Sequence, residues 1–300
     1  ARYYTQIIDN IAPNSLSGET FTSEDNINFI ISHQADKIKT DFEVYFTSYF
    51  GDEFLDDEQG DRFSESFYDQ MFLKPEIKTV YKKSKQKEFT FGLGNEYETL
   101  NRTYFEIEPK QNSPFIYFQY DYNPNEKINL ILGGRFDKYN EYKSQISPKF
   151  SGIYRFKNNQ SIKISTGYGY KKPDFRQLYF NFSNSTIGYS VIGYNVVEDV
   201  LNQLINEGQI ANVIIPIEEF DDPLSPESSF GLNIGYKRNL DENINFSANL
   251  FSNSAKNLID YRVIANKTNG QNVFSYYNVN NVSTFGFDIN TCLLYTSDAA

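Results

Sequence analysis

The chain has 300 residues, a length typical of one large domain or two small ones. It carries 28 Lys and Arg against 39 Asp and Glu, so its formal net charge is −11. This acidity excludes a general nucleic-acid binder, because neutralising phosphates requires a basic face. Aromatic residues make up 17% of the chain, which excludes intrinsic disorder. The mean hydropathy of −0.56, without any run of about 20 apolar residues, excludes a helical membrane protein.

Residues that carry chemistry are few. The chain has one His, His33, one Cys and no Trp. This excludes a His-rich or Cys-rich metal site, and any Ser-His or Cys-His enzyme not built on His33. We find no oriented nucleophile, no paired carboxylates and no phosphate-cradling Gly loop. We therefore expect neither an enzyme nor a protein with a cofactor or metal site.

Apolar and polar residues alternate with a period of two along most of the chain. Ile128, Leu130 and Leu132, for example, alternate with Asn129 and Gly133. Successive side chains of a strand point to opposite faces, so each such segment has one apolar and one polar face. We predict about a dozen strands, with 243–264 forming one strand or two. Their expected ranges are 1–8, 27–35, 40–50, 75–83, 87–98, 112–122, 127–138, 144–156, 160–171, 227–238, 243–264 and 273–290.

The connections between these strands alternate in length. Short polar turns are expected at 35–39, 83–86, 123–126, 157–160 and 239–242. Longer loops are expected at 9–26, 51–74, 99–111, 139–143, 172–226 and 265–272. A transmembrane β-barrel has short turns on the periplasmic side and long loops outside, and strands of roughly 9–12 residues fit a tilted bilayer crossing. We predict an all-β, antiparallel transmembrane barrel; a soluble sandwich or propeller is the alternative.

Aromatic residues gather near the ends of the predicted strands. In a barrel, such rings form girdles at the two membrane interfaces, where the ring is buried and a hydroxyl stays in water. Because Trp is absent, Tyr and Phe carry this role alone. The expected girdle residues are Tyr120, Tyr122, Tyr139, Tyr142, Tyr154, Phe156, Tyr168, Tyr170 and Tyr236.

Several short motifs follow one another over about 113–290. Their residues are Gly133, Arg135, Asp137, Ser147, Pro148, Lys149, Ser165, Gly167, Gly169, Pro173, Phe175, Leu178, Tyr179, Leu224, Pro226 and Glu227, with the run 249–259 and the segment 277–288. In this order and spacing they resemble the barrel strands of TonB-dependent outer-membrane receptors. Each motif alone is weak, and residues 1–112 fit only by their strand pattern.

The resemblance implies a receptor that the chain covers only in part. The family has a signal peptide, a TonB-contacting segment and a plug domain, followed by a 22-strand barrel. We expect residues 1–290 to be an internal piece of about 12 strands, because the chain begins in mid-pattern without a signal peptide. The expected partners are a TonB-type energy-coupling protein acting through the plug, outer-membrane lipid and a small-molecule ligand; the expected location is the outer membrane of a Gram-negative bacterium.

The longest predicted loop, 172–226, holds the candidate ligand site. Apolar residues between Val196 and Ile205 recur at helical spacing, which predicts a short amphipathic helix over the barrel mouth. That helix either shields the loop's own apolar residues or forms a ligand lid. An Arg and several aromatics precede it and suit an anionic, aromatic iron chelate, or equally an interfacial girdle. The candidate residues are Arg176, Tyr179, Phe180, Tyr189 and Tyr194.

Two further features have simpler interpretations. Loop 51–72 concentrates eight carboxylates around Arg62 alone, but it lacks EF-hand spacing, and we expect a solvated acidic loop rather than a Ca²⁺ site. His33 is in phase with Phe29 and Ile31, so we expect an interfacial His on the lipid-facing side. Residues 291–300 stop alternating and contain the only Cys, and we expect them to be a non-native read-through tail.

Three functions are compared. The first is energy-coupled import of a scarce ligand, such as a ferric siderophore or a cobalamin-like molecule. The second is a passive porin-type channel or surface adhesin barrel without a plug. The third, a barrel enzyme such as an outer-membrane lipase or protease, is poor because no usable His is present.

Overall fold

The computed structural model describes residues 2–12, 16–157, 159–184, 188–240 and 244–293. Twelve long strands form the wall: β1 (Arg2–Ala12), β2 (Leu16–Ala35), β3 (Ile38–Asp56), β4 (Arg62–Ser84), β5 (Lys87–Arg102), β6 (Lys110–Asn125), β7 (Ile128–Asp137), β8 (Gln145–Arg155), β9 (Gln160–Lys171), β13 (Glu227–Asn239), β14 (Ile244–Lys267) and β15 (Asn272–Leu293). The remaining elements are α1 (Phe175–Tyr179), β10 (Asn181–Asn184), β11 (Tyr189–Ile192), η1 (Tyr194–Val196), α2 (Val197–Asn206), β12 (Ile210–Val213) and η2 (Ile217–Phe220).

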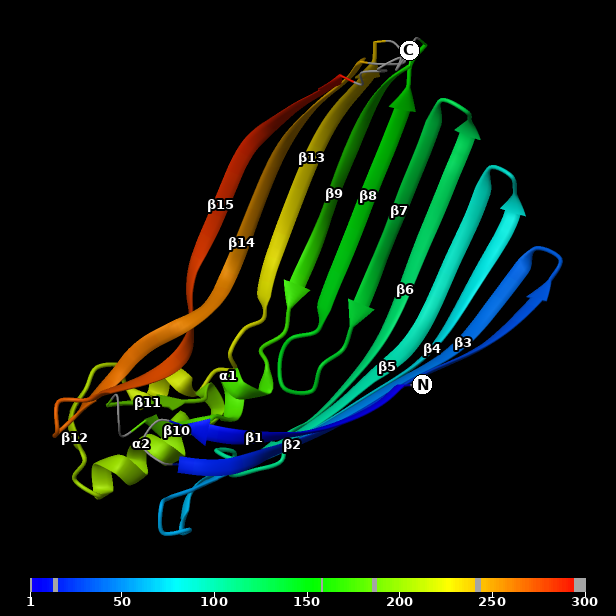
Figure 1. Cartoon of the computed structure of the whole chain (residues 1–300). Helices are drawn as coiled ribbons and strands as arrows, with labels where there is room; N and C mark the ends of the chain where they lie inside the picture. Colours follow the sequence, from blue (N-terminus) through cyan, green and yellow to red (C-terminus); the bar gives the residue numbers. More distant parts are fainter. Residues whose placement is uncertain (1, 13–15, 158, 185–187, 241–243, 294–300) are drawn as a thin grey trace, which may run out of the picture.

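The wall strands pair with their neighbours in chain order. The sheet runs β1 to β9 and then β13, β14 and β15, all antiparallel. Figure 1 shows it as a curved wall, with short turns at one end and α1 and α2 at the other. No helix among the described residues is long and apolar enough to cross a membrane. The twelve predicted wall strands are confirmed, and 244–267 is a single strand.

Register separates the two faces of the wall. Leu93, Ile116 and Phe136 are paired across β5, β6 and β7, and all three are exposed. Such a row of apolar side chains suits the lipid-facing side of a barrel. The next row along the same strands, which lies on the opposite face, ends in the acidic residue Asp137. The alternation in the sequence therefore becomes an apolar outer face and a polar inner face.

The strands extend further toward the mouth than we predicted. The expected loop 51–74 is mostly strand, because β3 runs to Asp56 and β4 starts at Arg62. The expected loop 9–26 is likewise mostly β1 and β2. The prediction of these two loops was wrong because apolar and polar residues do not alternate regularly there: Phe54 and Leu55, for example, are consecutive and point to opposite faces.

The tip of the β3–β4 hairpin shows what its acidic residues do. The Asp57 carboxylate accepts hydrogen bonds from the backbone N–H groups of Gln59 and Asp61, both at 2.9 Å. Arg62 pairs with Asp56 at 3.0 Å and lies over the Phe54 ring at 4.0 Å. These carboxylates therefore fold the turn.

The C-terminal boundary also differs from the expected one. Thr291 and Cys292 continue β15, paired with Phe246 and Asn245 on β14. The strand ends at Leu293, and residues 294–300 lie outside the described part of the chain. The interpretation of 291–300 as a non-native tail stays a prediction.

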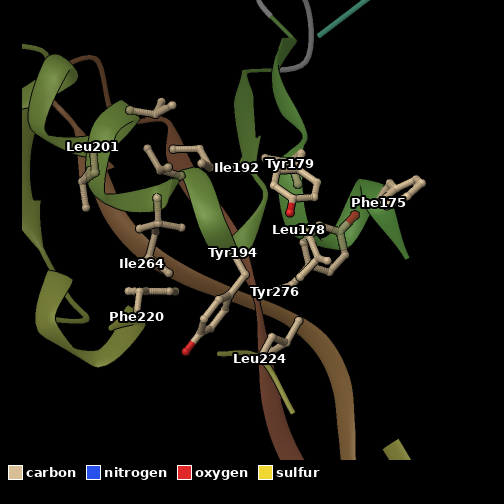
Figure 2. Close-up of a cluster of buried hydrophobic side chains, with 14 of the residues drawn as sticks. Phe175, Leu178, Tyr179, Ile192, Tyr194, Leu201, Phe220, Leu224, Ile264 and Tyr276 are labelled. Carbon is tan, nitrogen blue, oxygen red and sulfur yellow. The ribbon is translucent and has the colours of Figure 1, made fainter. Parts of the chain in front are cut away.

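The main apolar core lies at the mouth. We call residues 172–226 the mouth cap. Its side chains pack with Leu100 of β5 and with Ile264, Val273 and Tyr276 of β14 and β15. Figure 2 shows this cluster gathered between the cap segments and the two strands. The predicted helix is confirmed as α2, which buries Val197, Val200 and Leu201.

Close packing on the inner face yields a first prediction. A Cβ atom at Gly94 would lie 2.6 Å from Phe115 Cζ and 2.6 Å from the backbone oxygen of Pro75, which cannot move aside. We expect Gly94→Ala to lower the free energy of unfolding by about 1–3 kcal/mol. Gly134→Ala is the matched control, since a Cβ atom there has no neighbour closer than 3.9 Å. Denaturant unfolding in detergent measures both, and equal stability of the two variants would contradict the prediction.

Candidate functional site

The mouth cap is tied to both sides of the described wall. On one side, Lys172 Nζ donates to Glu98 Oε2 at 3.0 Å and to Gln111 Oε1 at 2.7 Å. The backbone N–H of Asn181 also donates to Tyr104 O at 2.8 Å. On the other side, β11 pairs with β15 and β12 pairs with β14. The cap therefore bridges from β5 and β6 to the end of the sheet.

Local sequence determines how α1 presents its residues. Asp174 and Gln177 form a capping box, in which Asp174 Oδ1 accepts from the Gln177 N–H at 2.8 Å. The helix buries Phe175, Leu178 and Tyr179, while Arg176 is exposed. Because the apolar residues fix the rotation of the helix, Arg176 projects away from the core.

A small sheet follows α1. β10 pairs antiparallel with β11, and β11 pairs parallel with β15. Paired residues share a face, so Phe182, Val191 and Phe274 lie together. Ile192 and Ser275 lie together on the other face, and both are fully buried. One face of this sheet thus belongs to the core, and the other is available to form a site.

A groove of about 560 Å³ follows that second face, and we call it the aromatic groove. It is lined by Arg176, Phe180, Phe182, Tyr189, Val191, Tyr261, Phe274 and Tyr276. Neighbouring rings touch along it: Phe180 stacks on Phe182 with centroids 5.5 Å apart, and Phe182 contacts Tyr189 at 6.1 Å. The volume lies within the usual range of small-molecule sites.

Arg176 supplies the only charge in the lining of the aromatic groove. Within the described part of the chain, its guanidinium makes no hydrogen bond or ion pair, in contrast to Arg135 on the inner wall. Asp174, its closest acidic neighbour in the sequence, is engaged in the capping box. The groove therefore combines a ring-lined surface with one accessible positive charge.

The structure divides the five predicted site residues. Arg176, Phe180 and Tyr189 line the aromatic groove together. Tyr179 and Tyr194 are buried in the cap core. Tyr179 donates its hydroxyl to Glu141 Oε2 at 2.8 Å, and Tyr194 donates to the backbone oxygen of Glu219 at 3.1 Å.

Sequence reasoning missed most of the groove's far wall. Phe182 and Val191 were reachable, because each lies two positions from a predicted site residue, Phe180 or Tyr189, on a strand. Phe274 and Tyr276 were not, since they join the groove only through the parallel pairing of β11 with β15. No local pattern indicates a pairing between segments so far apart in the sequence.

A second cavity, of about 660 Å³ and with a polar lining, lies on the inner face of the wall. Arg135 pairs with Asp137 at 2.7 Å and with Glu96 at 3.2 Å, and it lies over the Phe115 ring at 3.8 Å. The two charged residues of the Gly133–Asp137 motif therefore bind each other. Because Arg135 is already paired, its network suits a water-filled lumen or a packed plug better than it suits a charged ligand.

The remaining candidates offer no metal chemistry. Among the described residues, no three or more His, Cys, Asp or Glu side chains gather in a way that could hold a metal ion. His33 is exposed on β2, opposite Thr40. Its interpretation as an interfacial residue stays a prediction.

A sequence profile described as "TonB dependent receptor-like, beta-barrel" matches residues 2–296. The chain belongs to this family. No curated protein matches it in sequence. The fold is similar to that of the siderophore receptor PirA from Pseudomonas aeruginosa, with 15% identity and a TM-score of 0.62, covering 97% of this chain and 59% of that one.

Two other solved proteins, a transporter and a receptor, are similar in fold. One is the FrpB iron transporter of Neisseria meningitidis, with 13% identity, a TM-score of 0.61, and coverage of 98% of this chain and 46% of that one. The other is the Serratia marcescens hemophore receptor HasR, solved with its hemophore HasA and heme: 9% identity, TM-score 0.66, coverage 96% and 48%. The present chain thus spans roughly half the length of these solved receptors.

The attachment of the cap to the wall yields a second prediction. Lys172→Gln removes a partly buried ion pair with Glu98, and we expect it to weaken the cap by about 1–2 kcal/mol. Proteolysis within 172–226 should then become faster. Lys171→Gln is the control, because Lys171 is 60% exposed and lies 3.7 Å from Glu227. Equal cleavage rates for the two variants would show that the Lys172 contact does not hold the cap.

The buried tyrosines yield a third prediction. Burial, with nearby Tyr277 and Asp222, raises the pKa of Tyr194 to about 12. The folded cap therefore favours the neutral phenol. The raised pKa of Tyr194 contributes fully to the free energy of unfolding below the unfolded-state pKa of about 10. This contribution is lost as the pH rises toward 12.

Tyr194→Phe separates this effect from a simple loss of contact. At neutral pH the variant should be less stable by about 1 kcal/mol, because it loses the hydrogen bond to Glu219. Between pH 10 and 12 the deficit should shrink, since phenylalanine cannot ionise. Denaturant unfolding over this pH range measures the difference, and a constant deficit would contradict the assigned pKa.

Proposed function

We propose that this chain is the barrel portion of an energy-coupled importer of the outer membrane, which takes up a scarce ligand such as a ferric siderophore or a cobalamin-like molecule. One observation carries the proposal: a chain of this family forms an antiparallel wall with one apolar face, and a cap covers its mouth end. The similar solved proteins are named as siderophore, iron and copper transporters and a hemophore receptor.

The partners follow from the family. In this proposal a plug domain fills the lumen, and a TonB-type protein of the inner membrane pulls on it. The apolar outer rows contact outer-membrane lipid of a Gram-negative bacterium, and the polar inner face contacts the plug. In this proposal the protein acts by binding and conformational change, as do receptors and transporters such as those it is similar to.

The mouth cap favours gated import over a passive channel. A passive pore needs a continuous aqueous path, whereas the cap is bonded to β5, β6, β14 and β15 and has its own buried core. Moving it requires breaking those contacts, which suits a cycle of ligand capture and release. A porin-type channel or an adhesin barrel without a plug remains the competing function.

Sequencing the gene through both ends is the first test. We expect a signal peptide and a plug-sized domain upstream, and alternating strands in place of 294–300. A complete barrel gene without a plug would overturn energy coupling and support a porin or adhesin.

Uptake by cells provides the functional prediction. Cells with the complete gene should accumulate a labelled ferric catecholate, ferric hydroxamate or cobalamin above the level of a deletion strain. A protonophore should abolish this accumulation, because the coupling protein depends on the inner-membrane proton gradient. Uptake that is unaffected by the protonophore would identify a passive channel instead.

A further inference from the structure

We propose that the aromatic groove binds a flat, conjugated ring system that carries a carboxylate, in the manner of an aromatic acid. The inference rests on the proposed function, because it gives the chemical class of the ligand that the mouth recognises. It is carried by three features of the groove: the arrangement of its rings, the single free cation and the origin of its walls.

The rings determine the shape of the occupant. Six of the eight lining residues are Phe or Tyr, and adjacent rings lie within contact distance: Phe182 with Tyr189 at 6.1 Å, Tyr189 with Phe274 at 6.5 Å, and Tyr261 with Tyr276 at 4.7 Å. Such a surface favours planar groups that pack face-on or edge-on against the rings. It disfavours strongly hydrated ligands, because the few polar side-chain groups in its lining cannot replace a large hydration shell.

Arg176 determines the charge of the occupant. Its guanidinium is exposed, lines the groove and has no ion-pair or hydrogen-bond partner in the described part of the chain. A planar guanidinium matches a carboxylate with two parallel hydrogen bonds. No Asp or Glu lines the groove, so no negative charge in the lining repels an anion there.

The groove volume sets an upper limit on size. A cavity of 150 Å³ accommodates one benzene ring, so about 560 Å³ leaves room for roughly three ring-sized groups. An aromatic acid of one to three rings therefore fits.

The walls come from both the cap and the barrel. Phe180, Phe182 and Tyr189 belong to the cap, whereas Tyr261 and Phe274 belong to the wall strands β14 and β15. A ligand in the groove therefore contacts both bodies at once and stabilises the arrangement in which β11 is paired with β15.

Binding of three probes by the complete receptor in detergent tests the proposal. Naphthoate has rings and a carboxylate, naphthamide has the rings without the charge, and cyclohexanecarboxylate has the charge without a conjugated ring. Naphthoate should bind at least 10-fold more tightly than either of the others. Equal affinity for all three, or no binding of naphthoate, would overturn the proposal.

Substitutions in the groove test whether naphthoate binds there. Arg176→Gln should lower naphthoate affinity by about 10- to 100-fold, because a charge-assisted bond is lost. Tyr189→Leu should lower it as well. Arg238→Gln is the control, since Arg238 is an exposed arginine at the short-turn end of β13 and should leave affinity unchanged. If Arg176→Gln binds naphthoate like the wild type, the groove is not the site.

The binding assay is independent of energised uptake, so the two proposals fail separately. Naphthoate binding that depends on Arg176, in cells without protonophore-sensitive uptake, would overturn import and retain the groove. Protonophore-sensitive uptake together with naphthoate affinity that is unchanged by Arg176→Gln would retain import and overturn the groove.

Discussion

Backbone hydrogen bonding between neighbouring strands is the constraint on which the rest of this structure depends. In a bilayer, each N–H and C=O must find a partner in the adjacent strand, so the strands pair in an unbroken antiparallel series. The pairing fixes register, and register fixes which side chains meet. Phe115 lies over Gly94 and Arg135 lies over the Phe115 ring because the ladder allows little other choice. If one strand slipped by one residue against its neighbours, all of that strand's lipid-facing apolar side chains would turn to the lumen.

The same constraint explains where the core lies. A single β-sheet cannot bury side chains on both of its faces by itself. The apolar cluster therefore forms at the mouth, where the mouth cap adds a second layer. The cap also uses the edge of β15, where β11 adds a parallel strand over 272–275. Backbone groups at that edge thereby gain partners, and the cap gains a rigid attachment. The aromatic groove is a consequence of this attachment, since both of its walls meet there.

The sequence was informative where structure is periodic and local. Alternation predicted all twelve wall strands, and helical spacing predicted α2. The three short strands β10, β11 and β12 were missed, because four residues carry too little periodic signal and their partners are distant. Extended strand ends such as 51–56 were missed because apolar and polar residues do not alternate regularly along them. For the site, Arg176 and its neighbouring aromatics stood out, but Phe274 and Tyr276 depend on a pairing that only the folded chain reveals.

Charge placement gives the two cavities different roles. On the inner wall, Arg135 is paired with two carboxylates, whereas Lys78 and Lys149 line the same cavity without a salt bridge among the described residues. These two lysines lie deeper in the wall than the cap. Arg176 is the one charged residue in the lining of the aromatic groove, in a protein whose β3–β4 tip is rich in carboxylates. The carboxylates of that tip repel an anion, whereas Arg176 attracts it in the groove and Lys78 and Lys149 attract it in the inner-wall cavity. A negatively charged ligand thus gains a favourable interaction in each of the two cavities, which a neutral ligand would not gain.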